Sequence, residues 1–244
     1  KGFGATGTVR ELSRADHLEC PLRCRYHRWR GELVDATSDR LFDARHFPLI
    51  TSLMMGYRGH PFTLVAQDFK NPLLTNVFSK QRQLSGHKVI SSRRAMIRLL
   101  KALQSGGHAA FLTDLNVQPD NTATPIRCFS LLTCVTGLHA FLHQRTGAKL
   151  IPGIAIPCSD GTYLMKLLSP IPIHPHCTPT EITQRCWDAF EPHIRDFPEP
   201  WLWMYKHWRY RPEVDGDRYP DYANRSKEFD RLLEHAREQD EASL

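Results

Sequence analysis

Three features are absent from this 244-residue sequence: a long apolar run, a closely spaced cysteine pair and a typical start. No stretch approaches the roughly 20 apolar residues that a membrane-spanning helix needs. The seven cysteines are dispersed and include no Cys-x-x-Cys pair, so we expect neither a disulfide framework nor a zinc site, and a reducing compartment. Residues 1–7 resemble neither a signal peptide nor a natural start, so we expect that an N-terminal fragment has been lost.

Charge is distributed unevenly along the chain. The formal net charge is +6, but residues 213–244 carry ten acidic residues against five Lys and Arg, which leaves +11 on residues 1–212. A basic body favours anionic partners in general, whether nucleic acid, anionic lipid headgroups or an acidic carrier protein. Because no recognised nucleic-acid motif is present, we expect no nucleic-acid partner and keep a nucleic-acid-binding module only as a distant alternative.

The length and the 41% apolar share are sufficient for one compact domain. We expect one domain over residues 1–212. The charged, weakly apolar residues 213–244 are predicted to be a C-terminal tail or a surface helix.

Alternating strand and helix patterns from residue 62 predict an α/β fold with a mostly parallel central sheet flanked by helices. The first expected elements are strands at 62–67, 87–91 and 109–114, with helices at 71–86 and 93–104 between them. The later expected elements are a helix at 131–145, a hairpin of 150–157 and 163–168, and a helix at 178–195 with Thr180 as candidate N-cap.

Asp114 ends the third expected strand and precedes a long predicted loop, residues 115–128. In open α/β sheets the ligand site lies outside the carboxyl ends of the strands. Asp114 is therefore a candidate site residue, although a strand-end acid can also simply cap the loop that follows it.

Residues 197–212 read Phe-Pro-Glu-Pro-Trp-Leu-Trp-Met-Tyr-Lys-His-Trp-Arg-Tyr-Arg-Pro, and this segment is called the Trp block below. Its tryptophans and bases fit a nucleic-acid surface, an interfacial membrane helix or an aromatic core helix with a basic outer face. Covering a core and presenting bases to lipid phosphate are compatible on opposite faces of one helix.

The Trp block resembles the end of the bacterial lipid A biosynthesis lauroyl/myristoyl acyltransferases, a family of the lysophospholipid acyltransferase-like superfamily. Other blocks resemble this family in the same order over residues 46–212. They are Gly59-His60-Pro61, Asn71-Pro72, Arg82, the strand ending at Asp114, and Arg145-Thr146-Gly147-Ala148-Lys149-Leu150-Ile151-Pro152.

The resemblance implies a glycerolipid acyltransferase-like α/β fold, with an acyltransferase-like catalytic domain over residues 1–212 of which residues 1–45 are divergent. It also implies an enzyme that needs no metal or organic cofactor. Such an enzyme moves a fatty acyl chain from acyl carrier protein, or from acyl-CoA, to a hydroxyl of a lipid A-type or related glycolipid of lipopolysaccharide. It also implies a place on the cytoplasmic face of the cell inner membrane, with a peripheral contact or an N-terminal anchor that lies outside this chain.

The family's catalytic motif is His, four residues, then Glu or Asp, which provides a general base and the acid that orients it. The matching segment, residues 45–51, has His46 as the base and Thr51 at the acid position. Asp43 or Asp114 is a possible substitute orienter. His27 with Glu32 is a second candidate pair, and a catalytically impaired paralogue that binds lipid or carrier protein without turnover is the alternative function.

Substrate binding is expected at the cations of two blocks. Arg82 resembles the family's arginine for acidic substrates, with a solvated helix face as its alternative. The resemblance further implies that Trp201, Trp203, Lys206 and Arg209 hold phosphate or headgroup. The basic helix at 93–101 is expected to be a solvated face, with a dock for carrier protein or membrane as its alternative.

Overall fold

The computed structural model describes the following residues of the chain: 24–27, 36–39, 56, 59–66, 73, 76, 79–80, 83–84, 86–91, 94–110, 112–157, 163–199, 201, 203–213 and 218–241. Within them the chain is a mixed α/β protein.

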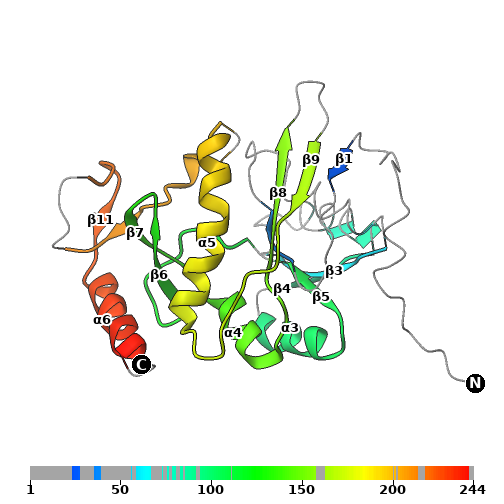
Figure 1. Ribbon diagram of the computed structural model, residues 1–244, viewed down its shortest axis with the longest axis horizontal. Helices are drawn as coiled ribbons and strands as arrows, with labels where there is room; N and C mark the ends of the chain where they lie inside the picture. Colours follow the sequence, from blue (N-terminus) through cyan, green and yellow to red (C-terminus); the bar gives the residue numbers. More distant parts are fainter. Residues whose placement is uncertain are drawn as a thin grey trace, which may run out of the picture.

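Two sheets adjoin one another in the part of the molecule labelled β1, β3, β4, β5, β8 and β9 in Figure 1. The first has the order β4 (Lys88–Ser91), β3 (Phe62–Ala66) and β5 (His108–Ala110), and all of its pairings are parallel. The second has the order β1 (Cys24–His27), β9 (Tyr163–Leu167), β8 (Ile151–Pro157) and β2 (Ala36–Asp39). Here β8 and β9 are antiparallel, and the outer strands are parallel to their neighbours. Contacts between β2 and β5 join the two sheets.

Two further pairs of strands lie towards the C-terminal half. An antiparallel hairpin joins β6 (Ala123–Cys128) to β7 (Leu131–Thr136). A short parallel pair joins β10 (Tyr210–Arg211) to β11 (Asn224–Arg225), and β10 contacts β7.

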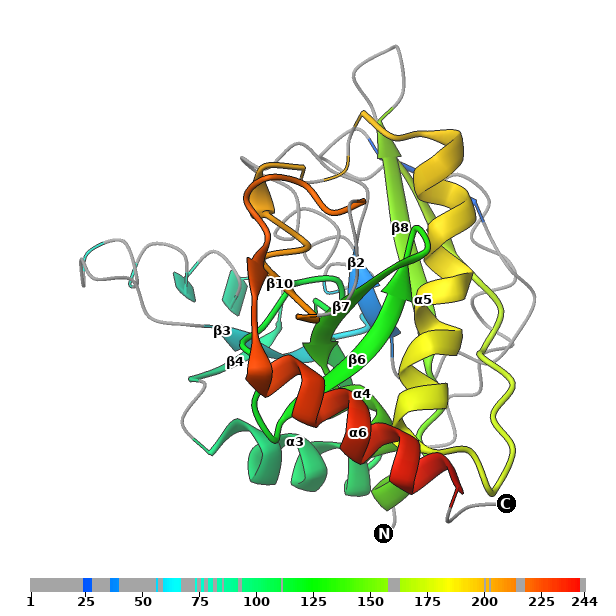
Figure 2. The ribbon, with the colours of Figure 1, turned by 90° about the vertical axis from the view of Figure 1, so that its left-hand side faces the viewer.

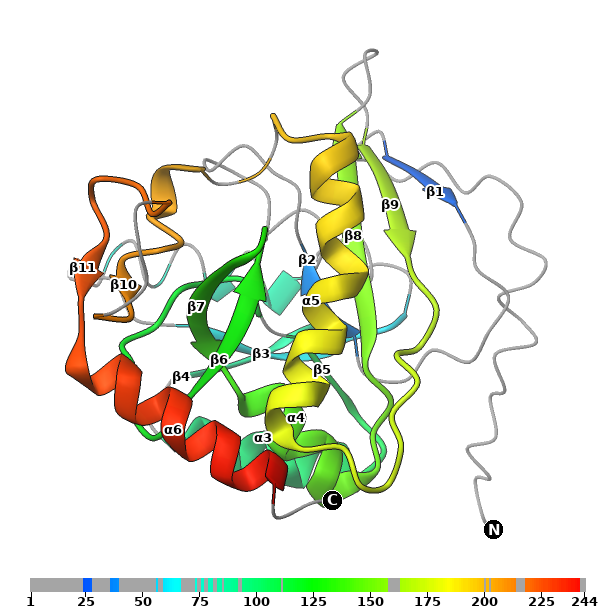
Figure 3. The ribbon, with the colours of Figure 1, turned by 60° about the vertical axis from the view of Figure 1, so that its left-hand side comes forward.

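The helices cover these strands from different sides. Helix α3 (Ala95–Gln104) packs on β3, β4 and β5 and against α4 (Leu138–Thr146). Helix α5 (Pro179–Asp196) contacts both β6 and β8, and Figure 3 shows it running along them. Helix α6 (Lys227–Glu241) lies on β6, and η2 (Trp203–Tyr205) is a single 3-10 turn in the Trp block. None of the described helices is long and apolar enough to cross a membrane.

Packing between elements follows their apolar faces. Leu99 of α3, Ala109 of β5 and Leu142 of α4 are buried together in one cluster. A larger cluster joins Ile126 and Val135 of the hairpin to three side chains of α5 and two tryptophans of the Trp block. These five residues are Trp187, Phe190, Ile194, Trp201 and Trp208. This second cluster therefore fixes the Trp block against the hairpin.

The α/β class is confirmed, and the expected parallel pairing is seen for β3 with β4 and β5. A single central sheet flanked by helices stays a prediction, because the described strands form several small sheets. The division of the chain at residue 212 also stays a prediction. Within 213–244, helix α6 packs through Phe229, whose side chain is fully buried.

Four predictions about individual elements are wrong. The strand predicted at 109–114 is β5, which ends at Ala110, so Asp114 lies four residues beyond it; the expected loop at 115–128 contains β6. The N-cap of α5 is Thr178, not Thr180. Thr178 and Glu181 form a capping box that satisfies two amides at the start of the helix, and Pro179 suits its first position.

The fourth wrong prediction is the helix at 131–145, which is instead strand β7 followed by α4. Apolar spacing suggested a continuous helix, but Thr133, Val135 and Thr136 are β-branched and pair with β6. Gly137 marks the change from strand to helix. A side chain there would overlap the Thr124 hydroxyl of β6, so this position requires glycine for space.

Candidate functional site

Asp114 and Trp201, which belong to two different family-like blocks, meet in the interior. Both residues are buried, with 4% and 3% of their surface exposed. The Trp201 indole N–H donates a hydrogen bond to Asp114 Oδ2 over 3.1 Å. The bond is charge-assisted when the carboxylate is ionised, and such bonds are stronger than neutral ones. The loop after β5 and the Trp block are therefore joined at one point.

His207 belongs to the same cluster, and it was not among the site residues predicted from the sequence. Its ring stacks on the Trp201 indole with centroids 4.0 Å apart and an interplanar angle of 13°. His207 Nδ1 lies 3.2 Å from the main-chain carbonyl oxygen of Asp114. Because a carbonyl oxygen only accepts, Nδ1 carries the hydrogen in this contact. The only sequence signal was a histidine within an aromatic run.

A second chain of hydrogen bonds fixes the backbone of His207. Thr133 of β7 donates its hydroxyl to the His207 carbonyl oxygen over 2.5 Å. Asn116 Nδ2 in turn donates to Thr133 Oγ1 over 3.2 Å. Asn116, Thr133 and His207 are all buried. Since buried polar groups are costly unless paired, this network orders the segment around Asp114 relative to β7 and the Trp block.

The aromatic residues of the Trp block are divided between core and surface. Trp201 and Trp208 are buried, whereas Trp203 is 47% exposed and packs edge-on against Trp201 with centroids 4.6 Å apart. The Trp203 indole N–H donates to the Pro198 carbonyl oxygen, so its polar atom is satisfied within the chain. The block forms a 3-10 turn and irregular backbone here, so the two helical interpretations of this segment are wrong.

The two predicted headgroup cations lie at the surface of the Trp block. Lys206 and Arg209 are both exposed. The Lys206 ammonium lies 5.8 Å from the centroid of the Tyr222 ring, within the range of a cation–π contact. The Lys206 backbone has a positive φ of 53°, which turns the chain between η2 and His207.

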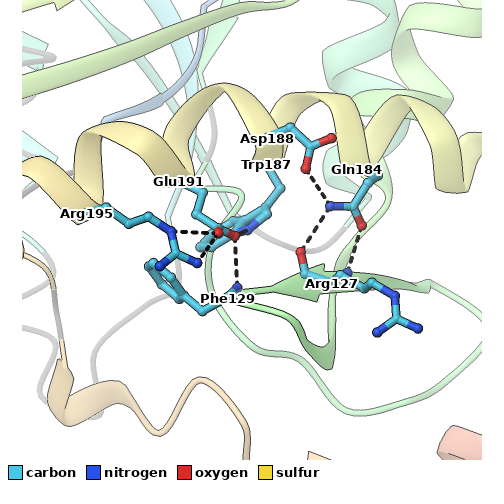
Figure 4. Close-up of polar contacts among 7 residues, drawn as sticks. All are labelled: Arg127, Phe129, Gln184, Trp187, Asp188, Glu191 and Arg195. Carbon is cyan, nitrogen blue, oxygen red and sulfur yellow. Dashed lines mark hydrogen bonds and ion pairs between the residues drawn. The ribbon is translucent and has the colours of Figure 1, made fainter.

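Glu191 of α5 forms a hub that sequence reasoning also missed (Figure 4). Its carboxylate accepts bonds from the Phe129 amide at 2.8 Å, the Trp187 indole at 2.9 Å and the Arg195 guanidinium at 2.7 and 3.0 Å. Burial alone raises the pKa of Glu191, but these donors outweigh it, so the pKa lies below its ordinary value. The only sequence signal was the spacing of Glu191 and Arg195 by one helical turn.

The Glu191 hub holds the turn between β6 and β7. Phe129 and Ser130, the two turn residues, have positive φ values of 49° and 72°. Arg195 also lies over the Phe129 ring, with its guanidinium carbon 4.8 Å from the ring centroid. The Phe129 ring contacts Trp187, Trp201, Trp203 and Trp208. The turn thus connects α5 to the Trp block.

Gln184 adds a second clamp between α5 and the hairpin (Figure 4). Its amide accepts from the Arg127 N–H at 2.7 Å and donates to the Arg127 carbonyl oxygen at 3.0 Å. It also donates to Asp188, one helical turn further on, at 2.8 Å. The side chain therefore pairs with β6 as a neighbouring strand would.

Other predicted site residues lie outside the part of the chain that the structure describes. These are His46, Thr51 and Arg82, together with Glu32. His27 ends β1, which pairs with β9. The described residues therefore bring together Asp114, Trp201 and Trp203, while the roles of the residues outside them stay predictions. The described residues contain no cluster of His, Cys, Asp or Glu suited to a metal ion.

Comparison with known proteins agrees with the resemblance seen in the sequence. Residues 49–210 match a family described as bacterial lipid A biosynthesis acyltransferase. The matched range includes Thr51, Arg82, Asp114 and most of the Trp block, and it begins three residues after His46. No curated protein matches the chain.

Proposed function

Because the chain belongs to the bacterial lipid A biosynthesis acyltransferase family, we propose that it transfers a fatty acyl chain from acyl carrier protein, or from acyl-CoA, to a hydroxyl of a lipid A-type glycolipid. The family supports acyltransferase activity in general, and the donor and acceptor are part of the proposal. The observation that carries it is the match over residues 49–210. The Asp114–Trp201 hydrogen bond supports it, because it joins two family-like blocks 87 residues apart.

The reaction requires a base at the acceptor hydroxyl. His46 would take the hydroxyl proton while the oxygen attacks the thioester carbonyl carbon; the carbon–sulfur bond then breaks, and the thiolate leaves and takes up a proton. Thr51 at the acid position can offer a hydroxyl, but it cannot balance the positive charge that forms on the imidazole. For scale, neutralising the orienting acid of a serine-protease triad costs about 10⁴ in turnover.

Asp114 has a role in this proposal as a positioning residue. Its carboxylate is buried and accepts from Trp201, while its carbonyl oxygen accepts from His207. Through these bonds it would hold the Trp block in place, so that the exposed Lys206 and Arg209 face acidic groups of the glycolipid. Arg82 would add a further cation for phosphate, which arginine binds in bidentate fashion.

The proposed function is tested by transfer of a labelled acyl chain from acyl carrier protein to a lipid A precursor. The parent is compared with His46→Ala, His27→Ala and Thr51→Glu. Loss only in His46→Ala supports the proposed base, and a gain of at least about tenfold in Thr51→Glu supports the assignment of position 51. Loss only in His27→Ala would move the base to His27.

Trp201→Phe, assayed beside these variants, tests the positioning role. Phenylalanine keeps most of the buried ring but removes the N–H that Asp114 accepts. We expect KM for the glycolipid to rise more than kcat falls, because the variant disturbs the binding surface and not the base. An equal fall in kcat and kcat/KM with unchanged KM would contradict this role.

A second candidate function is a non-catalytic paralogue that binds lipid or carrier protein. Threonine at position 51, where the family has an acid, favours it. A parent that binds the glycolipid without turnover, together with a Thr51→Glu variant that gains activity, would support this candidate over the first.

A further inference from the structure

The segment from Phe69 to Thr113 is basic and contains no acidic residue. It has eight Lys and Arg residues, whereas the average acid content of the chain would put about five Asp and Glu in a segment of this length. Five of the eight bases are described, and all of these are exposed; they are Lys80, Lys88, Arg94, Arg98 and Lys101. The segment therefore presents positive charge that its own sequence does not neutralise.

The same segment supplies most of the exposed large apolar side chains in the described part of the molecule. Leu73 and Leu84 are 72% and 73% exposed, and Met96 and Ile97 are 45% and 51% exposed. The other two such residues, Phe197 and Trp203, belong to a different region. Single exposed apolar residues need no explanation, whereas several exposed apolar side chains within one basic segment call for one.

Helix α3 shows how charge and apolar surface are combined. Ala95 and Leu99 are buried on its inner side. Arg94, Arg98 and Lys101 follow at spacings of four and three, so they form one stripe on the outer side, with Ile97 beside it. None of these three bases forms an ion pair with another described residue.

The positive charges at the beginning of α3 destabilise the helix. Arg94 is at the N-cap, where the positive end of the helix dipole disfavours a cation, and the first turn has no acidic residue. Arg94 also has a positive φ of 57°. A negatively charged partner outside the chain would remove the electrostatic cost.

The two parts of this surface lie on one side of the molecule. In Figure 2 the described residues within 73–84 project away from the body, beside β3 and β4. The first turn of α3 is directed to the same side. The projecting residues and the beginning of α3 thus lie towards the same side in this view.

We propose that this face docks on the surface of an anionic lipid bilayer. The docking face is defined by Leu84, Arg94, Ile97, Arg98 and Lys101. Lys and Arg bind the anionic headgroups, and the apolar side chains enter the boundary between headgroups and acyl chains, as in interfacial helices. An acidic carrier protein would complement the charge, but it would not account as well for apolar side chains that project so far into solvent.

The inference deepens the proposed function, because it locates the membrane that would hold the glycolipid acceptor. Docking itself needs neither donor nor acceptor. It is therefore measured on vesicles of phosphatidylcholine with about 30% phosphatidylglycerol, which contain no substrate, so a failure of docking and a failure of acyl transfer give separate results.

The experiment is co-sedimentation of the 244-residue chain with these vesicles and with vesicles of phosphatidylcholine alone. We expect binding to the anionic vesicles that weakens as NaCl is raised from about 0.1 M to 0.5 M. The variant Arg94→Gln/Arg98→Gln/Lys101→Gln should bind about 100-fold more weakly, at roughly fivefold for each base. Ile97→Ser should lose about tenfold at every salt concentration.

The matched control is Lys227→Gln/Arg231→Gln/Arg237→Gln on α6. It removes the same charge from exposed positions on another helix, and its binding should change less than about threefold. If near-ultraviolet circular dichroism shows that the triple α3 variant folds poorly, the single variant Lys101→Glu provides a milder test. Its binding to the anionic vesicles should be about tenfold weaker.

Several outcomes would overturn the proposal. One is a parent that binds neither kind of vesicle, and another is an equal loss in the α3 and α6 variants, which would reflect net charge alone. A third is unchanged vesicle binding in the α3 variant combined with weaker binding of acyl carrier protein, which would make this face a carrier-protein dock.

Discussion

His139 makes the stability of this protein sensitive to acid. It is the second residue of α4, with 1% of its surface exposed. Neither of its ring nitrogens has a hydrogen-bond partner among the described residues. Burial lowers the pKa of His139 from 6.5 to about 4, because the charged imidazolium would lose its hydration without gaining a partner.

The sign of the pH dependence follows from this lowered pKa. Below pH 6.5 the unfolded chain binds a proton at His139, whereas the folded protein does so only near pH 4. The free energy of unfolding therefore falls as the pH decreases through this window. Linkage gives a loss of about 2 kcal/mol from this residue between pH 7.5 and pH 5.

The perturbation is His139→Leu, which keeps a buried side chain of similar size without a titratable group. We expect the loss of stability between pH 7.5 and pH 5 to be about 2 kcal/mol smaller in the variant than in the parent. Urea unfolding at both pH values, followed by tryptophan fluorescence, measures this difference. His60, His108 and His193 also have pKa values lowered mainly by burial, so the parent's total loss should exceed the part due to His139.

The control is His176→Leu, since His176 is exposed in the loop before α5. Its loss of stability between the two pH values should equal that of the parent. If His139→Leu also matched the parent, the assignment of the acid sensitivity to a buried, unpartnered imidazole would be refuted.

Two further predictions concern the β6–β7 hairpin. Gly137→Ala should lower the free energy of unfolding by about 2 kcal/mol, because the new Cβ overlaps the Thr124 hydroxyl. Urea unfolding of the double variant Gly137→Ala/Thr124→Ala should show partial recovery of this loss. If the losses of the two single variants simply added in the double variant, the clash would be contradicted. Glu191→Gln should cost about 1–3 kcal/mol at pH 7, whereas the exposed Asp188→Asn should cost less than about 0.5. Since the pKa of Glu191 is lowered, the difference between Glu191→Gln and the parent should shrink as the pH falls below about 4.5, and a constant difference would contradict its role as a carboxylate acceptor.

Much of the protein could be predicted from residue patterns alone. The paired runs at 150–157 and 163–168 around Ser159-Asp160-Gly161 predicted the β8–β9 hairpin, and the apolar spacing after Arg93 predicted α3. The order of the blocks from Gly59-His60-Pro61 to the Trp block predicted the family. Local signals sufficed here because turn residues, helical periodicity and motifs each depend on residues within a short stretch of the chain.

The β6–β7 hairpin could not be predicted in this way. Its turn consists of Phe129 and Ser130 in the left-handed region, without the Asn-Gly or Asp-Gly pair that usually marks such a turn. Glu191 and Arg195, more than 60 residues further along the chain, hold this turn in place. Left-handed backbone is unfavourable for Phe and Ser, so tertiary contacts and not local preference determine the turn.

The sequence by itself determined the family, the α/β class and the candidate residues Asp114, Trp201 and Trp203. Only the tertiary structure decided that Trp201 donates to Asp114 and that His207 stacks on that indole. Hydrogen bonds between side chains 87 residues apart leave no periodicity or spacing in the sequence. They exist because packing of β7, α5 and the Trp block excludes water and leaves each buried polar group to find its partner within the chain.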